Sequence, residues 1–221
     1  MIYCMSDIHG EIDRFYKMLQ LIQFSDKDTL YVLGDVIDRK PNGIDILEEI
    51  MATPNIQFIR GNHEQMCLDT FWNTASSMTY NAKGVWKNNG GSSTYRELTY
   101  VCSLKDRNRI LKFISESPVC LDITVNNRKF HLVHGWPSSL EEDMIWGRPM
   151  DGIGDIWEDD VTPIIGHTPT VLLYPDEGRT APFHIYHSPF GYIAIDCGCG
   201  NETPRRRLAC LRLDDMEEFY V

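Results

Sequence analysis

The chain has 221 residues, of which 43 % are hydrophobic, and it carries a formal net charge of −11 at pH 7. This length suits one large domain, so we expect a single domain over residues 1–221. The hydrophobic fraction is sufficient for a packed core and argues against a disordered chain. The acidic balance argues against a nucleic-acid-binding surface, because such surfaces are basic.

The sequence indicates neither a membrane nor a secreted location. Its apolar runs fall well short of the roughly 20 residues that a membrane-spanning helix needs. The first residues lack the basic region and the apolar stretch of a signal peptide. The seven cysteines are odd in number and irregularly spaced, which argues against a disulfide framework. We therefore expect a cytoplasmic protein whose cysteines are mostly buried.

The N-terminal part of the chain alternates between strand and helix patterns. Short apolar runs predict strands at residues 2–5, 29–33 and 56–59. Apolar residues at helical spacing predict helices at 12–22 and 44–51. This β-α-β-α-β order predicts parallel strands that are joined by right-handed crossovers.

The remainder of the chain is mostly strand-like. Residues 73–94 are rich in Asn, Gly, Ser and Thr and predict a long loop, whereas residues 106–116 have a helical pattern. The acidic stretch 141–160 predicts a surface excursion, and Asn126-Asn127 predicts a hairpin turn. Further strands are expected at 119–125, 129–133, 163–165, 183–186, 192–196 and 208–213.

A polar cluster follows each of the first three predicted strands. These clusters are Asp7/His9, residues 34–39 and residues 60–64. In open α/β sheets, ligands bind beyond the carboxyl ends of the strands. The three clusters are therefore expected to lie at one edge of the sheet and to form one site.

Two of these clusters contain side chains that suit metal ions. Asp7-x-His9 offers a carboxylate and an imidazole, which divalent metals of borderline hardness accept, although such a pair at a strand end is more often incidental. Asp35 could bridge two metals, and Gly34 before it permits a close approach of the backbone. The competing interpretation of residues 34–39 is a strand-to-helix turn with an Asp cap.

The third cluster is more specific. It places a phosphate-binding cation, an amide ligand and a titratable imidazole on one turn, as Arg60, Asn62 and His63. The competing interpretation is a helix N-cap at Asn62 that is followed by ordinary surface residues.

Two later histidines also follow predicted strands. Alone, His134 and His167 would usually be structural, but here they supply the further imidazoles that a second metal needs. Arg148 is a further candidate phosphate contact, although alone it is simply a surface arginine.

In order and approximate spacing, these motifs resemble those of the calcineurin-like metallophosphoesterases. The matching segments are Asp7-x-His9, Gly34-Asp35-x-x-Asp38-Arg39, Gly61-Asn62-His63-Glu64, His134-Gly135 and Gly166-His167-Thr168. Arg60 and residues 145–148 are more narrowly similar to the phosphoprotein phosphatase branch, above all to small bacterial and bacteriophage lambda-type serine/threonine phosphatases. The resemblance implies an α/β fold, a β-sandwich flanked by helices (αββα) with β-α-β-α-β at the N-terminus.

The resemblance also implies a role for each residue. The first of two divalent metal ions would be bound by Asp7, His9 and Asp35. The second would be bound by Asp35, Asn62, His134 and His167, so that Asp35 is shared. His63 would be the general acid, oriented by Asp38, and Arg39, Arg60 and Arg148 would bind the phosphate. The metals expected are Mn, with Fe or Zn as alternatives.

The substrate expected from the resemblance is a phosphoprotein or phosphopeptide that carries phosphoserine, phosphothreonine or, in some relatives, phosphotyrosine. Residues 86–91 resemble a stretch that borders the cleft in lambda-type phosphatases, which favours this substrate over the alternative, diadenosine tetraphosphate. The chain lacks the extra length that larger relatives use to dock regulatory subunits, so no such subunit is implied. The segment around Cys197 differs from the usual pattern of these phosphatases, so the resemblance does not define the substrate-facing loop.

A remote alternative is a cysteine-dependent phosphatase. Cys199 and Arg205 have the C-x₅-R spacing of that class. However, Glu202 would place a negative charge in the phosphate cradle, and Pro204 removes an amide donor. The strand expected at 208–213 also stands where that class needs a helix N-terminus.

Overall fold

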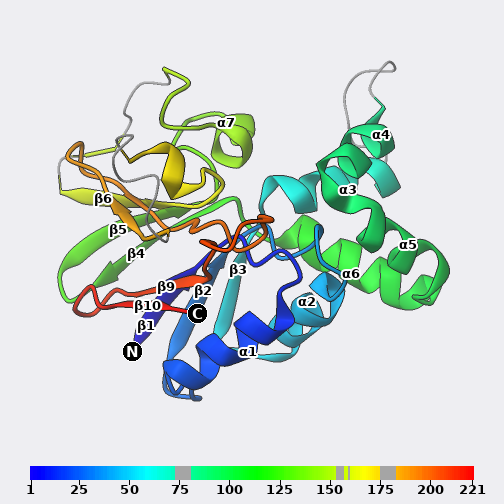
Figure 1. Ribbon diagram of the computed structural model, residues 1–221, viewed down its shortest axis with the longest axis horizontal. Helices are drawn as coiled ribbons and strands as arrows, with labels where there is room; N and C mark the ends of the chain where they lie inside the picture. The colour runs from blue at the N-terminus through cyan, green and yellow to red at the C-terminus, as the bar shows by residue number, and fades with distance from the viewer. Residues whose placement is uncertain (73–80, 153–156, 159, 175–182) are drawn as a thin grey trace.

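Two five-stranded β-sheets lie face to face in the computed structural model, and helices cover the outer face of the first sheet (Figure 1). The structure describes residues 1–72, 81–152, 157–158, 160–174 and 183–221. This arrangement confirms the expected α/β sandwich flanked by helices.

The first sheet has the strand order β10-β9-β1-β2-β3. Its strands are β1 (Ile2–Met5), β2 (Thr29–Leu33), β3 (Ile56–Ile59), β9 (Ala209–Arg212) and β10 (Glu218–Tyr220). The first three strands are parallel, as the β-α-β-α-β pattern predicts, and β9 and β10 extend the sheet by antiparallel pairing. Helices α1 (Ile12–Leu21) and α2 (Gly43–Ala52) form the crossovers.

The second sheet has the strand order β4-β5-β6-β8-β7. Its strands are β4 (Cys120–Val125), β5 (Arg128–Val133), β6 (Val161–Ile165), β7 (Tyr186–His187) and β8 (Ile193–Ala194). The expected hairpin joins β4 to β5, and both of its turn residues have positive φ, 49° at Asn126 and 65° at Asn127. Strands β5, β6 and β8 are parallel.

Alternate residues of β1 serve two different cores. Tyr3 and Met5 pack with residues of α1, α2 and α6 (Leu104–Glu116), between the first sheet and its helices. Cys4 points the other way and packs with Phe130 and Ile164 of the second sheet. This period-two pattern follows from strand geometry and holds the two sheets together.

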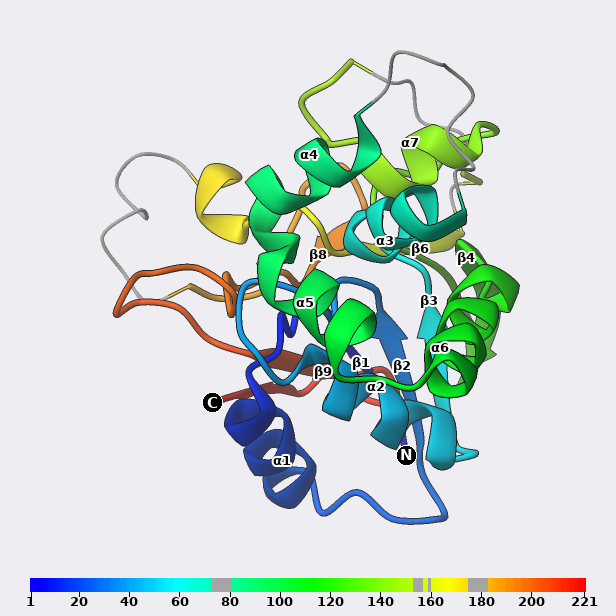
Figure 2. The ribbon, with the colours of Figure 1, turned by 90° about the vertical axis from the view of Figure 1, so that its right-hand side faces the viewer.

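The remaining helices gather beside the sheets, where α3 to α6 lie on the right of Figure 1 and face the viewer in Figure 2. They are α3 (Asn62–Trp72), α4 (Ala82–Trp86), a kinked segment (Lys87–Gly91), α5 (Ser92–Tyr100), α6 (Leu104–Glu116), α7 (Glu141–Trp146) and a 3₁₀-helix (Thr170–Leu172). The kink lies at Gly90, whose φ of 99° is not helical. No helix in the described part of the chain is both long and apolar enough to span a bilayer.

The predicted loop at 73–94 is wrong for the part that the structure describes. Residues 82–94 are helical apart from a break at Gly90, and residues 73–80 fall outside the described residues. The side chain of Asn81 caps α4 by accepting a hydrogen bond from the Gly84 N–H at 2.9 Å. Trp86 is fully buried and packs against Phe71 and Tyr95. Tertiary packing thus overrides the low helix propensity of the Asn and Gly residues.

Three further expectations need correction. The strand expected at 183–186 lies instead at Tyr186–His187, as β7. Phe183 is outside it because its backbone N–H donates to the Arg205 carbonyl of a neighbouring loop, at 3.1 Å. The surface excursion at 141–160 begins with helix α7. Strand β10 was not expected, since its pattern is a short mixture of acidic and aromatic residues.

Candidate functional site

The carboxyl ends of β1, β2 and β3 meet at one edge of the first sheet, and the three polar clusters follow them there (Figure 1). The loops are tied to one another by backbone hydrogen bonds. The Asp7 N–H donates to the Gly34 carbonyl at 3.2 Å, and the His9 N–H donates to the Asp35 carbonyl at 2.9 Å. An added Cβ at Gly34 would lie 2.5 Å from the Gly61 Cα, so the close approach of the second and third loops requires glycine there.

The second sheet contributes two imidazoles to the same edge. His134 follows β5 and His167 follows β6, and these two strands are parallel neighbours. The His134 Nδ1–H donates to the Leu33 carbonyl at 2.7 Å, and the His167 N–H donates to the Asp7 carboxylate at 3.0 Å. The site therefore lies where the edges of both sheets meet.

Several site residues have strained backbones. Asp7, His9, Asp35, Asp38 and His167 have φ values of 54°, 50°, 54°, 73° and 59°. Positive φ is uncommon for residues other than glycine. A concentration of such residues at one sheet edge is typical of a functional site, where the surrounding structure enforces the strain.

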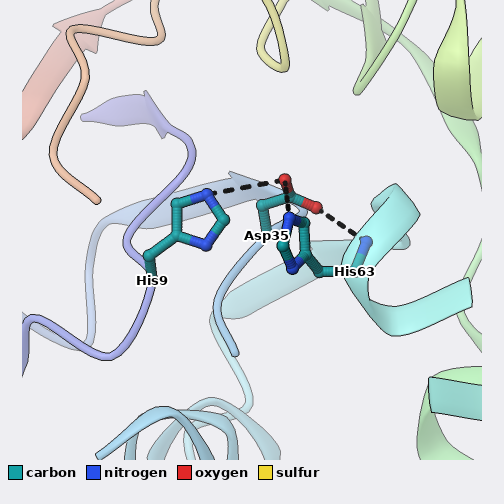
Figure 3. Close-up of side chains that lie close together, drawn as sticks. All are labelled: His9, Asp35 and His63. Carbon is teal, nitrogen blue, oxygen red and sulfur yellow. Dashed lines mark hydrogen bonds and ion pairs between the residues drawn. The ribbon is translucent and has the colours of Figure 1, made fainter. Parts of the chain in front are cut away.

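The Asp35 carboxylate lies at the centre of the site. Its Oδ2 is 3.6 Å from His9 Nε2 and 3.8 Å from His63 Nε2, and Figure 3 shows these imidazoles on either side of it. Its Oδ1 accepts a hydrogen bond from the His63 N–H at 3.1 Å and lies 3.3 Å from His134 Nε2. Asp35 is thus shared by two groups of side chains that could hold a metal ion, one with His9 and His63 and one with His134 and His167.

The orientation of the imidazoles suits metal binding. His9 and His134 each donate Nδ1–H to a backbone carbonyl, that of Ile37 at 3.1 Å and that of Leu33 at 2.7 Å. Such a bond selects the tautomer that leaves Nε2 free as a ligand. In both residues Nε2 then points toward Asp35.

Unsatisfied buried atoms show that a cation fits this site. His9 Nε2 and His167 Nε2 are buried without a hydrogen-bond partner among the described residues. The Asn62 side-chain oxygen faces acceptor atoms, with His134 Nε2 at 3.0 Å and the Asp35 oxygens at 3.1 and 3.2 Å. Rotating the amide would satisfy Asn62, whereas a cation bound between these groups would be ligated by the amide oxygen and by the two imidazole nitrogens together.

Burial and mutual charge perturb these groups strongly. Burial lowers the pKa of His134, but Asp35 outweighs this effect and raises that pKa to about 10. Burial, followed by repulsion from His134, lowers the pKa of His167 to about 2. Burial also lowers the pKa of His9. For Asp35, burial raises the pKa, but the neighbouring imidazoles, His134 foremost, hold it well below its usual value. A functional site commonly gathers such perturbed groups.

The structure joins His63 to Asp38. The His63 Nδ1 and Asp38 Oδ2 are 2.7 Å apart, and both side chains are buried. Burial lowers the pKa of His63, but the Asp35 and Asp38 carboxylates outweigh burial and raise it. His63 Nε2 faces the shared carboxylate, so it lies where a substrate bound at the site would meet it.

The three candidate phosphate-binding arginines differ in their surroundings. The Arg39 guanidinium donates to the Asn201 side chain at 3.1 Å. That of Arg148 donates to the His167 carbonyl at 3.1 Å. That of Arg60 forms an ion pair with Glu141 at the start of α7. Arg39 and Arg148 therefore lie free of carboxylate partners among the described residues, whereas Arg60 is neutralised.

Two buried carboxylates have roles that the sequence did not reveal. Glu64 accepts hydrogen bonds from four backbone N–H groups, those of Asp35, Val36, Ile37 and Gly61. It thereby holds the Asp35 loop against α3, and its only sequence signal was its place beside His63. Asp196 follows β8 and accepts a hydrogen bond from the Gly198 N–H at 2.8 Å. Burial is the largest cause that raises the pKa of Asp7, and the negative charge of Asp196 is the second.

The cysteine-dependent alternative is contradicted by the surroundings of Cys199. The thiol is 1 % exposed and donates to the Ile8 carbonyl at 3.6 Å. Burial raises its pKa to about 12, so the thiolate nucleophile that this chemistry needs is not available.

Comparisons with known proteins show which family the chain resembles. A sequence-family model described as calcineurin-like phosphoesterase matches residues 1–198. Serine/threonine-protein phosphatase 2 of Escherichia coli (strain K12) is 29 % identical over 162 residues, which are 69 % of this chain and 69 % of that protein. The symmetrical bis(5′-nucleosyl)-tetraphosphatase of Delftia acidovorans is 29 % identical over 136 residues, which are 61 % of this chain but 41 % of that protein.

The fold is also found among solved structures. A candidate diadenosine tetraphosphatase superposes with a TM-score of 0.66 at 14 % identity, over 100 % of this chain and 92 % of that chain. At this identity the likeness concerns the fold alone. The relatives found by sequence are of two kinds, a serine/threonine-protein phosphatase and bis(5′-nucleosyl)-tetraphosphatases.

We expect Glu64→Gln to lower the free energy of unfolding by about 2–4 kcal/mol, because the new amide nitrogen leaves backbone N–H donors unsatisfied. The matched control is Glu116→Gln. Its side chain is exposed and forms an i,i+4 ion pair with Lys112, so the change should alter stability by less than about 0.5 kcal/mol. Urea unfolding of both variants in the presence of a chelator measures the difference. Similar values for the two variants would contradict the bracing role of Glu64.

Proposed function

The chain belongs to the calcineurin-like phosphoesterase family, and from this premise we propose that it is a metal-dependent phosphomonoesterase that dephosphorylates phosphoserine and phosphothreonine in proteins. The observation that carries the proposal is the Asp35 carboxylate, which is shared by two groups of buried metal-ligating side chains. Groups of this composition suit divalent metals of borderline hardness.

We assign Asp7, His9 and Asp35 to the first metal ion, and Asp35, Asn62, His134 and His167 to the second. Two such ions supply an activated water and neutralise the charge on the phosphate oxygens, which is the main requirement of phosphoryl transfer. Mn is the metal proposed, with Fe and Zn as alternatives. His63 also lies in a group with His9 and Asp35 that could hold a metal ion. The metal content of any His63 variant must therefore be measured together with its activity.

His63 is the general acid of the proposal. Its Nδ1 is bound by Asp38 and its Nε2 faces the centre of the site. The Nε2–H would transfer its proton to the leaving oxygen as the bond from phosphorus to that oxygen breaks. Asp38 fixes the orientation of the ring and stabilises its protonated form.

The arginines bind the phosphate oxygens in this proposal. Arg39 and Arg148 have no carboxylate partner among the described residues, so their guanidinium groups can turn to an anion without breaking an ion pair. Arg60 must first leave Glu141, a surface pair whose loss costs about 1 kcal/mol or less. Bidentate binding by guanidinium suits the geometry of phosphate.

Two observations favour a phosphoprotein over a dinucleotide. At equal identity, the match to the protein phosphatase takes in a larger share of both chains than the match to the tetraphosphatase. An oriented acid is also of most use when the leaving group is an alkoxide, as in phosphoserine. In a dinucleoside polyphosphate the leaving group is itself a phosphate and needs no proton. The tetraphosphatase matches keep the dinucleotide as the second candidate.

We expect His63→Asn to retain its metal ions and to lose about 10²–10⁴-fold of kcat on a phosphoserine peptide, because no proton reaches the alkoxide. The loss on p-nitrophenyl phosphate should be smaller, since nitrophenolate leaves without a proton. Steady-state kinetics on both substrates and elemental analysis of the protein measure these outcomes. Equal losses on the two substrates, or a lower metal content, would contradict the general-acid role.

The substrate class is tested by comparing kcat/KM for a phosphoserine peptide, a phosphotyrosine peptide and diadenosine tetraphosphate with added Mn²⁺. We expect the phosphoserine peptide to be preferred. A preference for the dinucleotide of about tenfold or more, equivalent to about 1.4 kcal/mol of transition-state binding, would replace the proposal by its alternative.

A further inference from the structure

The Asp38 carboxylate is held by a second donor besides His63. Its Oδ2 accepts from Trp86 Nε1–H at 2.5 Å and lies 2.7 Å from His63 Nδ1. Asp38 and Trp86 are both 0 % exposed. We propose that Trp86 is a positioning residue for the reaction: its indole N–H fixes the carboxylate that orients the acid. This inference rests on the general-acid role proposed for His63.

Asp38 has few other constraints on its side chain. Its Oδ1 is buried without a hydrogen-bond partner among the described residues. Its backbone N–H donates to the Thr94 hydroxyl at 3.1 Å, which fixes the main chain but not the rotation of the carboxylate. Only two donors therefore define the place of Oδ2, and one of them is the ring whose orientation it must control. Without Trp86 Nε1–H, Asp38 and His63 would be free to shift together.

Trp86 is itself held firmly. Its ring makes edge contacts with Phe71 and Tyr95, with centroids 6.1 Å apart in each case. Gly91 lies directly against the indole, where an added Cβ would overlap the ring. An indole wedged in this way offers its N–H in one direction, which is what a fixed support for Oδ2 requires.

The chemistry of the indole suits this role. The Trp Nε1–H is a donor only, so it cannot compete with Asp38 for the proton of His63. It carries no charge, so the Asp38 carboxylate keeps its full attraction for the protonated imidazole. A charged donor at this place would weaken that attraction.

The same helical segment also holds the neighbouring arginine. The Gly90 carbonyl accepts from the Arg39 N–H at 3.1 Å. Gly90 has a φ of 99°, and an added Cβ there would lie 3.0 Å from the Arg39 Cγ. Residues 86–94 therefore support the acid and one phosphate-binding residue through separate contacts.

The test is Trp86→Phe, which keeps an aromatic ring in the cavity and removes the N–H. We expect kcat on a phosphoserine peptide to fall on the order of tenfold, as for loss of a hydrogen bond to a charged group. On p-nitrophenyl phosphate it should fall less than about threefold, and the metal content should not change. A merely structural role would lower both activities equally, and that result would overturn the inference.

Trp136→Phe is the matched control. Trp136 is also buried, but its Nε1 has no hydrogen-bond partner among the described residues. It should therefore change kcat by less than about twofold on both substrates, since no hydrogen bond is lost. A loss on the phosphoserine peptide equal to that of Trp86→Phe would overturn the inference.

The double variant Trp86→Phe/His63→Asn separates the inference from the function on which it rests. If Trp86 acts through His63, its replacement should have an effect of less than about twofold once the imidazole is absent. Additive losses would overturn the positioning role while leaving the acid in place. Equal losses of His63→Asn on both substrates would instead overturn the acid role itself. Should Trp86→Phe fail to fold, Trp86→benzothienylalanine removes the N–H from a ring of the same shape and decides the same question.

Discussion

The Asp35 carboxylate lies among three imidazoles at 1 % exposure, with a pKa that these neighbours hold well below its usual value against the effect of burial. A buried anion in this position is stable only when positive charge surrounds it. The two sheets meet that condition by bringing His9 and His134 to Asp35. Glu64 does not add positive charge, but it accepts hydrogen bonds from the backbone N–H groups of the Asp35 loop and so holds that loop in place.

The convergence of the site could be predicted from the sequence because it follows from strand direction. Polar residues that follow parallel strands must lie at one sheet edge, and Asp7, Asp35 and Asn62 do so. Strands β5 and β6 are also parallel, so His134 and His167, which follow them, lie at the same edge. No local sequence pattern predicted that these two strands pair.

The features that escaped prediction depend on contacts between distant segments. Residues 82–94 have the composition of a loop, yet they are helical apart from the kink at Gly90, because Trp86 is buried against Phe71 and Tyr95. Sequence could not indicate that this tryptophan reaches Asp38, since the two residues are 48 positions apart. In the same way, the ion pair between Arg60 and Glu141 connects a loop of the first sheet to a loop of the second. No local sequence pattern predicts that contact.

The central claim is that Asp35 is shared by two metal ions. Titration of the metal-free protein with Mn²⁺, followed by calorimetry, tests it most directly. We expect two ions to bind per chain in the unaltered protein and one ion in His9→Ala and in His167→Ala. In Asp35→Ala we expect neither ion to bind with micromolar affinity. A single ion in the unaltered protein, or an Asp35→Ala variant that still binds two, would contradict it.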